Sequence, residues 1–110
     1  FITTDAHFPT ILKYNADVNG DGDPVNVYEI ICGPLSAIRY GIPQIPLPTL
    51  DTTFKPAILY IEGGIYNFGY FKIHRDNDGL THLSVSIMGE DGLPRPSSNI
   101  DFTPQQNITG

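Results

Sequence analysis

Residues 65–88, IYNFGYFKIHRDNDGLTHLSVSIM, decide the fold that we predict for this chain. In the second half of this stretch, Leu83, Val85 and Ile87 alternate with polar side chains. The middle of the stretch is polar and ends in Asp78-Gly79, where glycine supplies the positive φ that a tight turn requires. Alternation with a period of two indicates strands that bury one face. We therefore expect an antiparallel hairpin over residues 65–88.

The rest of the chain is also predicted to form strands and loops, with few helices. Apolar or β-branched stretches at residues 1–4, 25–32 and 57–61 are typical of strands. Between the second and third of these stretches, residues 33–56 contain five prolines: Pro34, Pro43, Pro46, Pro48 and Pro56. Because proline lacks an amide donor and has a fixed φ, we expect a long irregular loop over residues 33–56. Residues 93–110 are polar and contain proline, which predicts an extended tail.

Composition restricts the classes of function. Six Lys and Arg against twelve Asp and Glu give a net charge of −6, which argues against a nucleic-acid groove because such grooves need clustered cations. No apolar stretch is long enough to span a membrane, and one cysteine excludes an internal disulfide framework. The 110 residues suit a single domain or part of one. Because the chain opens on Phe1 with no initiator Met and no signal peptide, we expect it to begin after processing or inside a longer chain.

The first group of residues that suggests chemistry is Thr3-Thr4-Asp5-Ala6-His7. A carboxylate and an imidazole two positions apart, just after a short β stretch, can both reach a cation at the carboxyl end of a strand. Asp offers a hard oxygen and His a neutral nitrogen, a combination that suits a di-metal centre of Fe, Mn, Zn or Ca. The alternative is an Asp that caps a turn beside an exposed His.

The order of several short blocks resembles the C-terminal part of the PhoD-like alkaline phosphatase and phosphodiesterase family of metallophosphoesterases. Residues 1–8, FITTDAHF, resemble the family's last metal-binding strand, hydrophobic-x-T-(G/T)-D-x-H. Residues 27–37, VYEIICGPLSA, are similar to its E-(F/V)-V-T-G-P-L-x-A stretch. Residues 50–54, LDTTF, and 66–73, YNFGYFKI, followed by the predicted hairpin, complete the order. Together the blocks cover nearly the whole chain.

The resemblance implies a phosphoester hydrolase in which two metal ions bridge the phosphate and activate a water nucleophile. It implies Asp5 and His7 as metal ligands, with Fe and Ca as the expected ions and Mn or Zn as the other options. It also implies that this chain is the C-terminal part of a four-layer α/β/β/α sandwich, and an exported protein that is secreted, periplasmic or at the cell surface. Thr4 stands where the family usually has Gly.

The resemblance also identifies what these residues lack. The family's earlier ligand motifs are an Asp-bearing strand, a second Asp with a Tyr or Asp partner, and an Asn-bearing loop, and none has a counterpart here. We therefore expect the 110 residues alone to be inactive. Their partners would be the remainder of a phosphatase chain, or other copies of the same chain.

A second group of residues resembles half of a calcium loop. Asp17, Asn19, Asp21 and Asp23 occupy loop positions 1, 3, 5 and 7, and glycine occupies position 6. Position 12 is Tyr28, and the nearest acid is one residue later, so the match is incomplete. The stretch is either a calcium site in a β context or an acidic solvated turn. The calcium interpretation supports an alternative function: a non-catalytic extracellular structural or self-assembling β module, stabilised by calcium at residues 17–23.

Two further features have weaker implications. His74 and His82 lie on the two arms of the predicted hairpin and can be cross-strand neighbours. We favour a polar pair on the solvent face over a metal site, because no carboxylate or cysteine lies in register with both. Asn107-Ile108-Thr109 is a sequon for N-glycosylation, which matters only in a protein secreted by a eukaryote.

Overall fold

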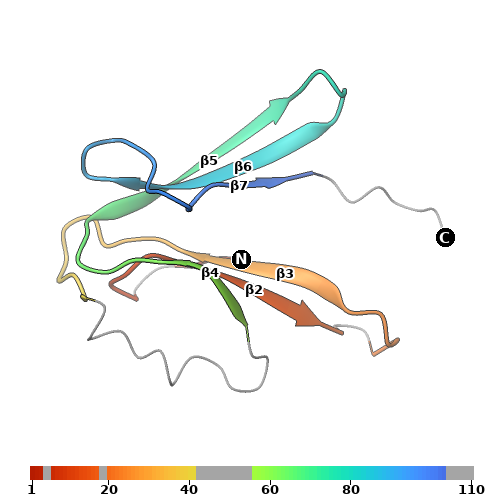
Figure 1. Ribbon diagram of the computed structural model, residues 1–110, viewed down its shortest axis with the longest axis horizontal. Helices are drawn as coiled ribbons and strands as arrows, with labels where there is room; N and C mark the ends of the chain where they lie inside the picture. The colour runs from red at the N-terminus through yellow and green to blue at the C-terminus, as the bar shows by residue number, and fades with distance from the viewer. Residues whose placement is uncertain (4–5, 18–19, 42–55, 104–110) are drawn as a thin grey trace.

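The computed structural model describes residues 1–3, 6–17, 20–41 and 56–103. Within these residues the chain forms seven strands and no helix: β1 (Ile2–Thr3), β2 (Thr10–Ala16), β3 (Val25–Ile31), β4 (Ala57–Ile61), β5 (Asn67–Arg75), β6 (Thr81–Gly89) and β7 (Ile100–Phe102). The expectation of a mainly β protein is confirmed (Figure 1). None of the described residues belongs to a helix that could cross a membrane.

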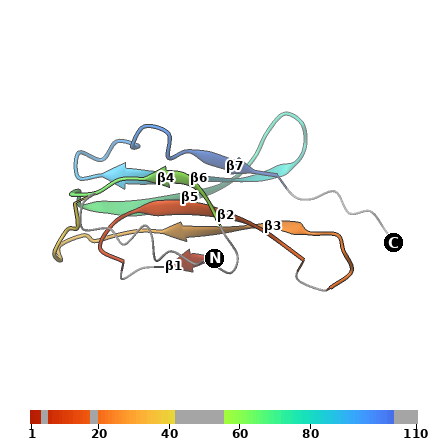
Figure 2. The same cartoon turned by 60° about the horizontal axis from the view of Figure 1, so that its bottom comes forward.

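The strands form two sheets. The mixed sheet has the order β1-β3-β2-β4, in which β2 is antiparallel to both of its neighbours and β1 is parallel to β3. The hairpin sheet is antiparallel and has the order β5-β6-β7. The two sheets are stacked as the two layers of a sandwich (Figures 1 and 2).

The expected hairpin is confirmed, with strand bounds that differ by one or two residues from the prediction. β5 and β6 pair in an unbroken antiparallel register that places Phe71 opposite Val85 and His74 opposite His82. In the connecting turn, Gly79 has a φ of 79°, in the left-handed region that favours glycine. The Asp78 carboxylate accepts a hydrogen bond from the Leu80 amide at 2.7 Å. The Asp-Gly pair therefore closes the hairpin in the way that the sequence predicts.

The core lies between the two sheets. Its buried members are Ile11, Ile30, Cys32 and Tyr60 from the mixed sheet and Val85 and Ile87 from the hairpin sheet. Both sheets therefore bury one face against the other, as apolar alternation requires.

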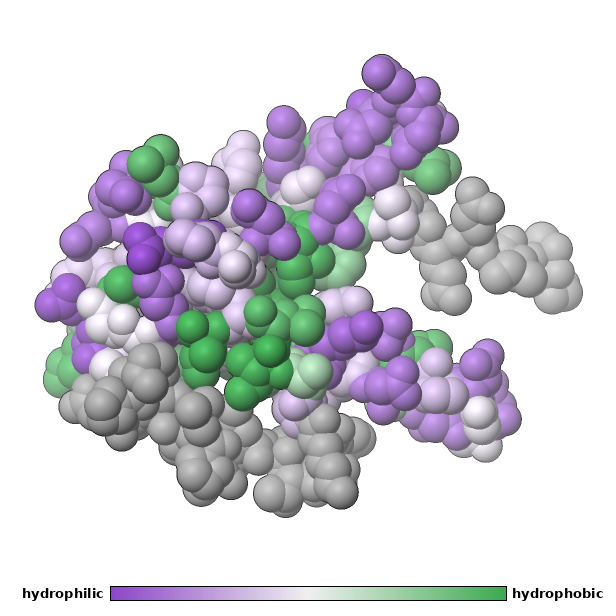
Figure 3. Space-filling view, in the orientation of Figure 1, coloured by the Kyte–Doolittle hydropathy of each residue, from purple (hydrophilic) through white to green (hydrophobic). Residues whose placement is uncertain are grey.

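The sheets meet closely at one end and diverge towards the other (Figure 1). Ile73 lies on the same face of β5 as the core residue Phe71, yet 76% of it is exposed because no strand of the mixed sheet reaches it. A cavity of about 290 Å³ opens there beside Ile73, Leu83 and Phe102. Figure 3 shows apolar surface where the two layers separate. At this end of the sandwich, part of the apolar face of the hairpin sheet is not covered by any of the described residues.

Two strands differ from the sequence-based expectations. β2, the central strand of the mixed sheet, was not predicted because Lys13 and Asn15 interrupt its apolar pattern; it forms because it pairs on both sides. β7 lies inside the expected tail at 93–110 and pairs with β6 through Val85 and Ile100. Of the predicted loop at 33–56, residues 33–41 are irregular and residues 42–55 lie outside the described part.

A charged contact ties the two layers together beside the core. Glu62, just after β4, accepts two hydrogen bonds from the Arg95 guanidinium, at 3.0 Å and 2.5 Å. The Tyr60 hydroxyl donates to the same carboxylate at 2.7 Å. The hydrogen bonds from Arg95 and Tyr60 hold the pKa of the Glu62 carboxyl below its ordinary range, against the effect of burial. A bidentate contact of this kind positions the β6–β7 connection on the mixed sheet.

The first prediction concerns the close approach of the layers at Gly69. A Cβ added there would lie 2.5 Å from Cys32 Sγ and 2.7 Å from Phe71 Cε2. We expect Gly69→Ala to lower the free energy of unfolding by about 1–3 kcal/mol through overpacking, measured by urea denaturation. In a Cys32→Ala background the loss should be smaller because Sγ is absent. Equal stability of Gly69→Ala and the parent would contradict this account of the core.

The second prediction concerns the Glu62–Arg95 pair. Because the pKa of Glu62 is lowered in the folded state, its contribution is complete above about pH 4.5 and is lost as the pH falls through the folded-state pKa. We expect Arg95→Met to lower the free energy of unfolding at pH 7, because the variant loses both hydrogen bonds to the Glu62 carboxylate. The difference between variant and parent should shrink at pH 3, measured by urea denaturation at both pH values. A difference that is independent of pH would show that the lost contact is packing alone.

Candidate functional site

The parallel pair β1–β3 brings two of the predicted sequence blocks together. Ile2 and Thr3 pair with Ile30 and Ile31, so the carboxyl ends of β1 and β3 lie side by side. His7 follows β1 and residues 32–37 follow β3, and both reach the same end of the mixed sheet. Segments that follow parallel strands converge in this way, which is why sites often form at this edge.

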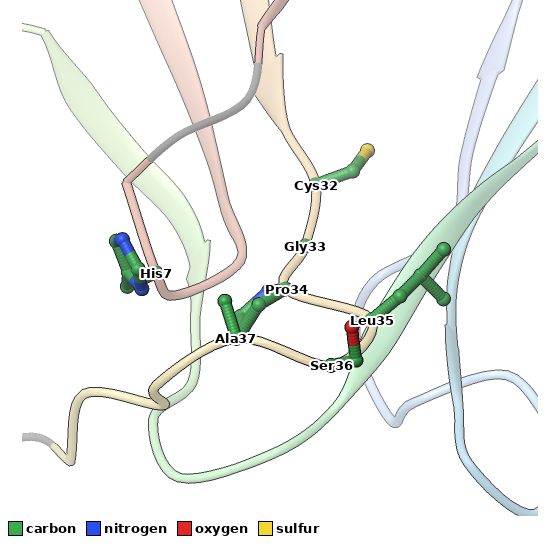
Figure 4. Close-up of a pocket in the computed structure, with 7 residues that line it drawn as sticks. All are labelled: His7, Cys32, Gly33, Pro34, Leu35, Ser36 and Ala37. Atoms are coloured by element: carbon green, nitrogen blue, oxygen red, sulfur yellow. The ribbon is translucent and has the colours of Figure 1, made fainter.

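The two segments line a cavity of about 340 Å³. Its lining consists of His7, Cys32, Gly33, Pro34, Leu35, Ser36 and Ala37. Figure 4 shows His7 on one side and the loop on the other, with Pro34 and Ala37 on the side of the loop nearer to the imidazole. His7 of the D-x-H block and residues 33–37 of the G-P-L-x-A block, which are distant in sequence, therefore share one concave surface.

The His7 imidazole is held by its own surroundings. Nδ1 lies 2.5 Å from the carbonyl oxygen of Ile38, and the ring stacks on Tyr40 with centroids 5.1 Å apart. A carbonyl can only accept, so Nδ1 carries the proton and Nε2 of the neutral ring is left with a free lone pair. No described residue forms a hydrogen bond with Nε2. A histidine that ligates a metal typically has this arrangement, with its other nitrogen fixed by a backbone carbonyl.

The backbone of His7 is unusual as well. Its φ is 60°, in the left-handed region that non-glycine residues seldom adopt. The amide of Tyr40 donates to the His7 carbonyl at 3.0 Å, so the same neighbour fixes both the main chain and the ring. Sparsely populated backbone conformations persist where the surroundings over-determine them, and such positions cluster at ligand sites.

Asn67 holds the opposite wall of the cavity. This side chain is 1% exposed; its Oδ1 accepts from the Gly33 amide at 2.7 Å and its Nδ2 donates to the Gly33 carbonyl at 2.8 Å. Its own amide donates to the Pro34 carbonyl at 2.9 Å. The sequence analysis did not single out Asn67. The available signal was an amide side chain at the apolar start of the hairpin, where a buried polar group must have partners.

Among the described residues, His7 is suited to donate to a metal ion at this site. His7 offers one nitrogen, and Asp5, the other predicted ligand, lies outside the described residues. Cys32 also lines the cavity, and burial raises the pKa of its thiol, which favours the neutral form when no metal is bound. The described part of the chain places no other His, Cys, Asp or Glu with His7 in a ligand cluster. A complete shell therefore needs donors beyond those described.

The acidic loop uses its carboxylates to cap its own backbone. Asp17 accepts from the amides of Asp21 and Gly22 at 3.1 Å and 2.8 Å, and Asp21 accepts from the amide of Asp23 at 2.8 Å. The contact between Asp21 and Asp23 is that of an Asx turn, whereas Asp17 accepts from amides four and five residues further on. Asn19 lies outside the described residues, and the calcium site at 17–23 stays a prediction.

The histidines of the hairpin form the cross-strand pair that the sequence suggested, but not in isolation. His74 and His82 stack with ring centroids 5.3 Å apart. His82 Nδ1 lies 3.0 Å from Asp101, and its Nε2 lies 2.9 Å from Asp78. We expected no carboxylate in register with both histidines, and Asp101 is indeed paired with Ser84. However, β7, which the sequence analysis did not predict, brings a carboxylate oxygen of Asp101 within 4.8 Å of both rings.

The carboxylates and the His82 imidazole of this cluster shift one another's pKa values so that each charged form is favoured. The hydrogen bond to Asp78 raises the pKa of the His82 imidazole, with Asp101 acting in the same direction. Hydrogen bonds from Leu80 and then His82 lower the pKa of Asp78, and those from Ser84 and then His82 lower the pKa of Asp101. Paired acids and bases shift one another in this way when they share protons.

Comparisons of this chain with protein-family models, with curated proteins and with solved structures find no match. The resemblance to the PhoD-like family therefore rests on the ordered sequence blocks at 1–8, 27–37, 50–54 and 66–73. Residues 50–54 lie outside the described part of the structure, and so does the sequon at Asn107, which stays a prediction.

The third prediction tests how the cavity wall is held. Asn67→Ala leaves the buried amide and carbonyl of Gly33 without their partner, and we expect a loss of about 2–4 kcal/mol in the free energy of unfolding. The amide of Gly33 should also exchange with deuterium faster, measured by NMR. Asn15→Ala is the matched control: Asn15 is exposed and bonds only a side chain, so its loss should stay below about 0.5 kcal/mol. Similar losses for both variants would contradict the special role of Asn67.

Proposed function

We propose that this chain supplies the C-terminal segment of a PhoD-like phosphoester hydrolase, and that Asp5 and His7 are two ligands of its metal centre. The ordered sequence blocks support membership of the family. The fold supports a shared site for two of these blocks. β1 and β3 are parallel, and His7 of the D-x-H block reaches the same cavity as residues 33–37 of the G-P-L-x-A block. The two β layers correspond to the inner layers of the proposed four-layer sandwich, whose helices come from the rest of the enzyme.

One observation carries the proposal: the fixed orientation of the His7 ring. His7 Nδ1 donates its hydrogen to the Ile38 carbonyl and Tyr40 stacks on the ring, so in the neutral ring the lone pair lies on Nε2. A histidine that merely faced solvent would need neither contact. In metal-binding histidines the nitrogen that does not bind the metal is typically held by a hydrogen bond of this kind.

The roles of the remaining residues follow from this arrangement. When bound, two metal ions of the expected Fe and Ca type, or Mn or Zn, polarise a phosphoester and supply an activated water. Asp5 and His7 are two of the ligands, and residues 33–37, anchored by Asn67, form the wall on the far side of the imidazole. The other ligands come from outside these 110 residues, so the chain alone is not a hydrolase. In keeping with the resemblance, we propose an exported enzyme.

A second candidate function, a self-assembling structural β module, is favoured by one edge of the mixed sheet. β4 is the outermost strand of that sheet, and its Ile58 and Leu59 are each 43% exposed. An uncapped apolar edge strand is a template for pairing with another strand. In the enzyme, the remainder of the chain covers this edge; in the module, another copy of the same chain covers it.

The fourth prediction distinguishes the two functions. We expect the full-length gene product that contains these residues to hydrolyse bis(p-nitrophenyl) phosphate, and the 110-residue chain alone not to do so. In the full-length protein, His7→Asn should lower kcat by about 100-fold or more and should reduce the bound metal measured by mass spectrometry. Glu90→Gln, in the exposed turn after β6, is the control and should retain the parent's rate.

Two results would overturn the enzyme proposal. One is a full-length product without turnover in the presence of Fe, Ca, Mn or Zn. The other is a His7→Asn variant with the parent's rate and metal content. Regular self-association of the 110-residue chain in analytical ultracentrifugation, together with either result, would establish the module instead.

A further inference from the structure

A second group of metal-ligating side chains lies far from His7, on the outer face of the hairpin sheet. His74 on β5 is directly opposite His82 on β6, and Asp101 on β7 is opposite Ser84. Because side chains alternate along a strand, His82, Ser84 and their neighbours point away from the core residues Leu83 and Val85. Three adjacent strands therefore place two imidazoles and a carboxylate on the outer face of the sheet, where His82 is 6% exposed.

The three groups are close enough to share an ion. One ligand atom from each of His74, His82 and Asp101 lies within 4.8 Å of the other two. Donors bound at about 2.0–2.2 Å to a tetrahedral zinc lie roughly 3–4 Å apart, so closure needs only small side-chain rotations. The Asp101 carboxylate accepts from Ser84 Oγ at 3.0 Å and lies 3.0 Å from His82 Nδ1. A bound ion would take the place of the contact with His82 and release the proton of that nitrogen to solvent.

One nitrogen of the cluster has no partner. His74 Nδ1 is buried and has no hydrogen-bond partner in the structure. A buried polar atom of this kind carries a desolvation cost unless something binds it. A cation that takes up this lone pair would remove that cost, and no described side chain does so.

The two turn carboxylates hold the other edge of the rings. Asp78 lies 2.9 Å from His82 Nε2, and Asp76 lies 3.4 Å from His74 Nε2 and 3.5 Å from His82 Nε2. Carboxylates on the far nitrogens are the usual outer support of histidines that bind a metal, because they fix the ring and its tautomer. They also add negative charge that a cation would offset.

We propose that His74, His82 and Asp101 bind one divalent transition-metal cation of the zinc class, with Asp76 and Asp78 as positioning residues. Two imidazoles favour Zn²⁺, Co²⁺, Ni²⁺ or Cu²⁺ over Ca²⁺ and Mg²⁺, which prefer shells made of oxygen ligands. Water completes the shell. The bound ion has ligands on β5, β6 and β7. It therefore stabilises the position of the three-residue strand β7, which among the described strands pairs only with β6. This site is independent of the proposed phosphatase centre.

The test is a calorimetric titration with Zn²⁺, made in a His7→Asn background so that the proposed phosphatase ligand does not contribute. We expect one saturable site with a Kd of about 10 μM or lower. At saturating Zn²⁺, Tm should rise by about 5 °C or more. His74→Gln, His82→Gln and Asp101→Asn should each weaken binding by at least about 10-fold. Asp91→Asn, a carboxylate in the exposed turn after β6, is the matched control and should change Kd less than about 2-fold.

A spectroscopic measurement covers the case in which a histidine variant does not fold. With Zn²⁺ added to the protein that keeps both histidines, the NMR signals of the His74 and His82 ring protons should shift together, in proportion to occupancy. Co²⁺ in place of Zn²⁺ should give the visible absorption of a site with nitrogen and oxygen ligands. Absence of saturable Zn²⁺ binding, ring signals that do not move, or unchanged affinity in the folded histidine variants would each overturn the proposal. None of these results depends on phosphoester hydrolysis.

Discussion

The structure depends on the packing of two sheets through a small set of apolar side chains. Ile11 and Ile30 on one layer meet Val85 and Ile87 on the other, and Gly69 lets the layers approach where Cys32 lies between them. A chain of this size can bury only one modest core, so each element that carries a candidate site is positioned by that contact. Where the contact ends, the layers separate and apolar surface is exposed (Figures 1 and 3).

The cavity beside His7 is an outcome of this packing rather than a separate feature. Asn67 is the first residue of β5 in the hairpin sheet, yet its side chain forms hydrogen bonds with Gly33, which follows β3 of the mixed sheet. The wall of the cavity is thus anchored across the two layers. His7 is held from the other side by Ile38 and Tyr40, so both walls are rigid before any ligand arrives.

The two candidate sites lie on different parts of the fold and use different chemistry. The cavity at the ends of β1 and β3 offers one imidazole from this chain and needs donors from elsewhere. The cluster on the hairpin sheet contains two imidazoles and three carboxylates that come from this chain alone: His74, His82, Asp76, Asp78 and Asp101. In our proposals the first is therefore a part of a larger site, whereas the protein ligands of the second come from this chain alone. Their metal preferences are accordingly expected to differ.

Local patterns in the sequence determined the mainly β character, the hairpin and its Asp-Gly turn, because alternation and turn chemistry act over a few residues. They also pointed to His7 and to the pairing of His74 with His82. They did not reveal β2, whose polar residues are tolerated only because strands flank it on both sides.

Only the tertiary structure decided which distant groups meet. The parallel pairing of β1 with β3 brings His7 to residues 33–37, and the pairing of β7 with β6 brings Asp101 to the histidines. The buried role of Asn67 arose in the same way. The physical reason is that these contacts join residues about twenty to more than thirty positions apart, and no local propensity or periodicity encodes a partner at that distance.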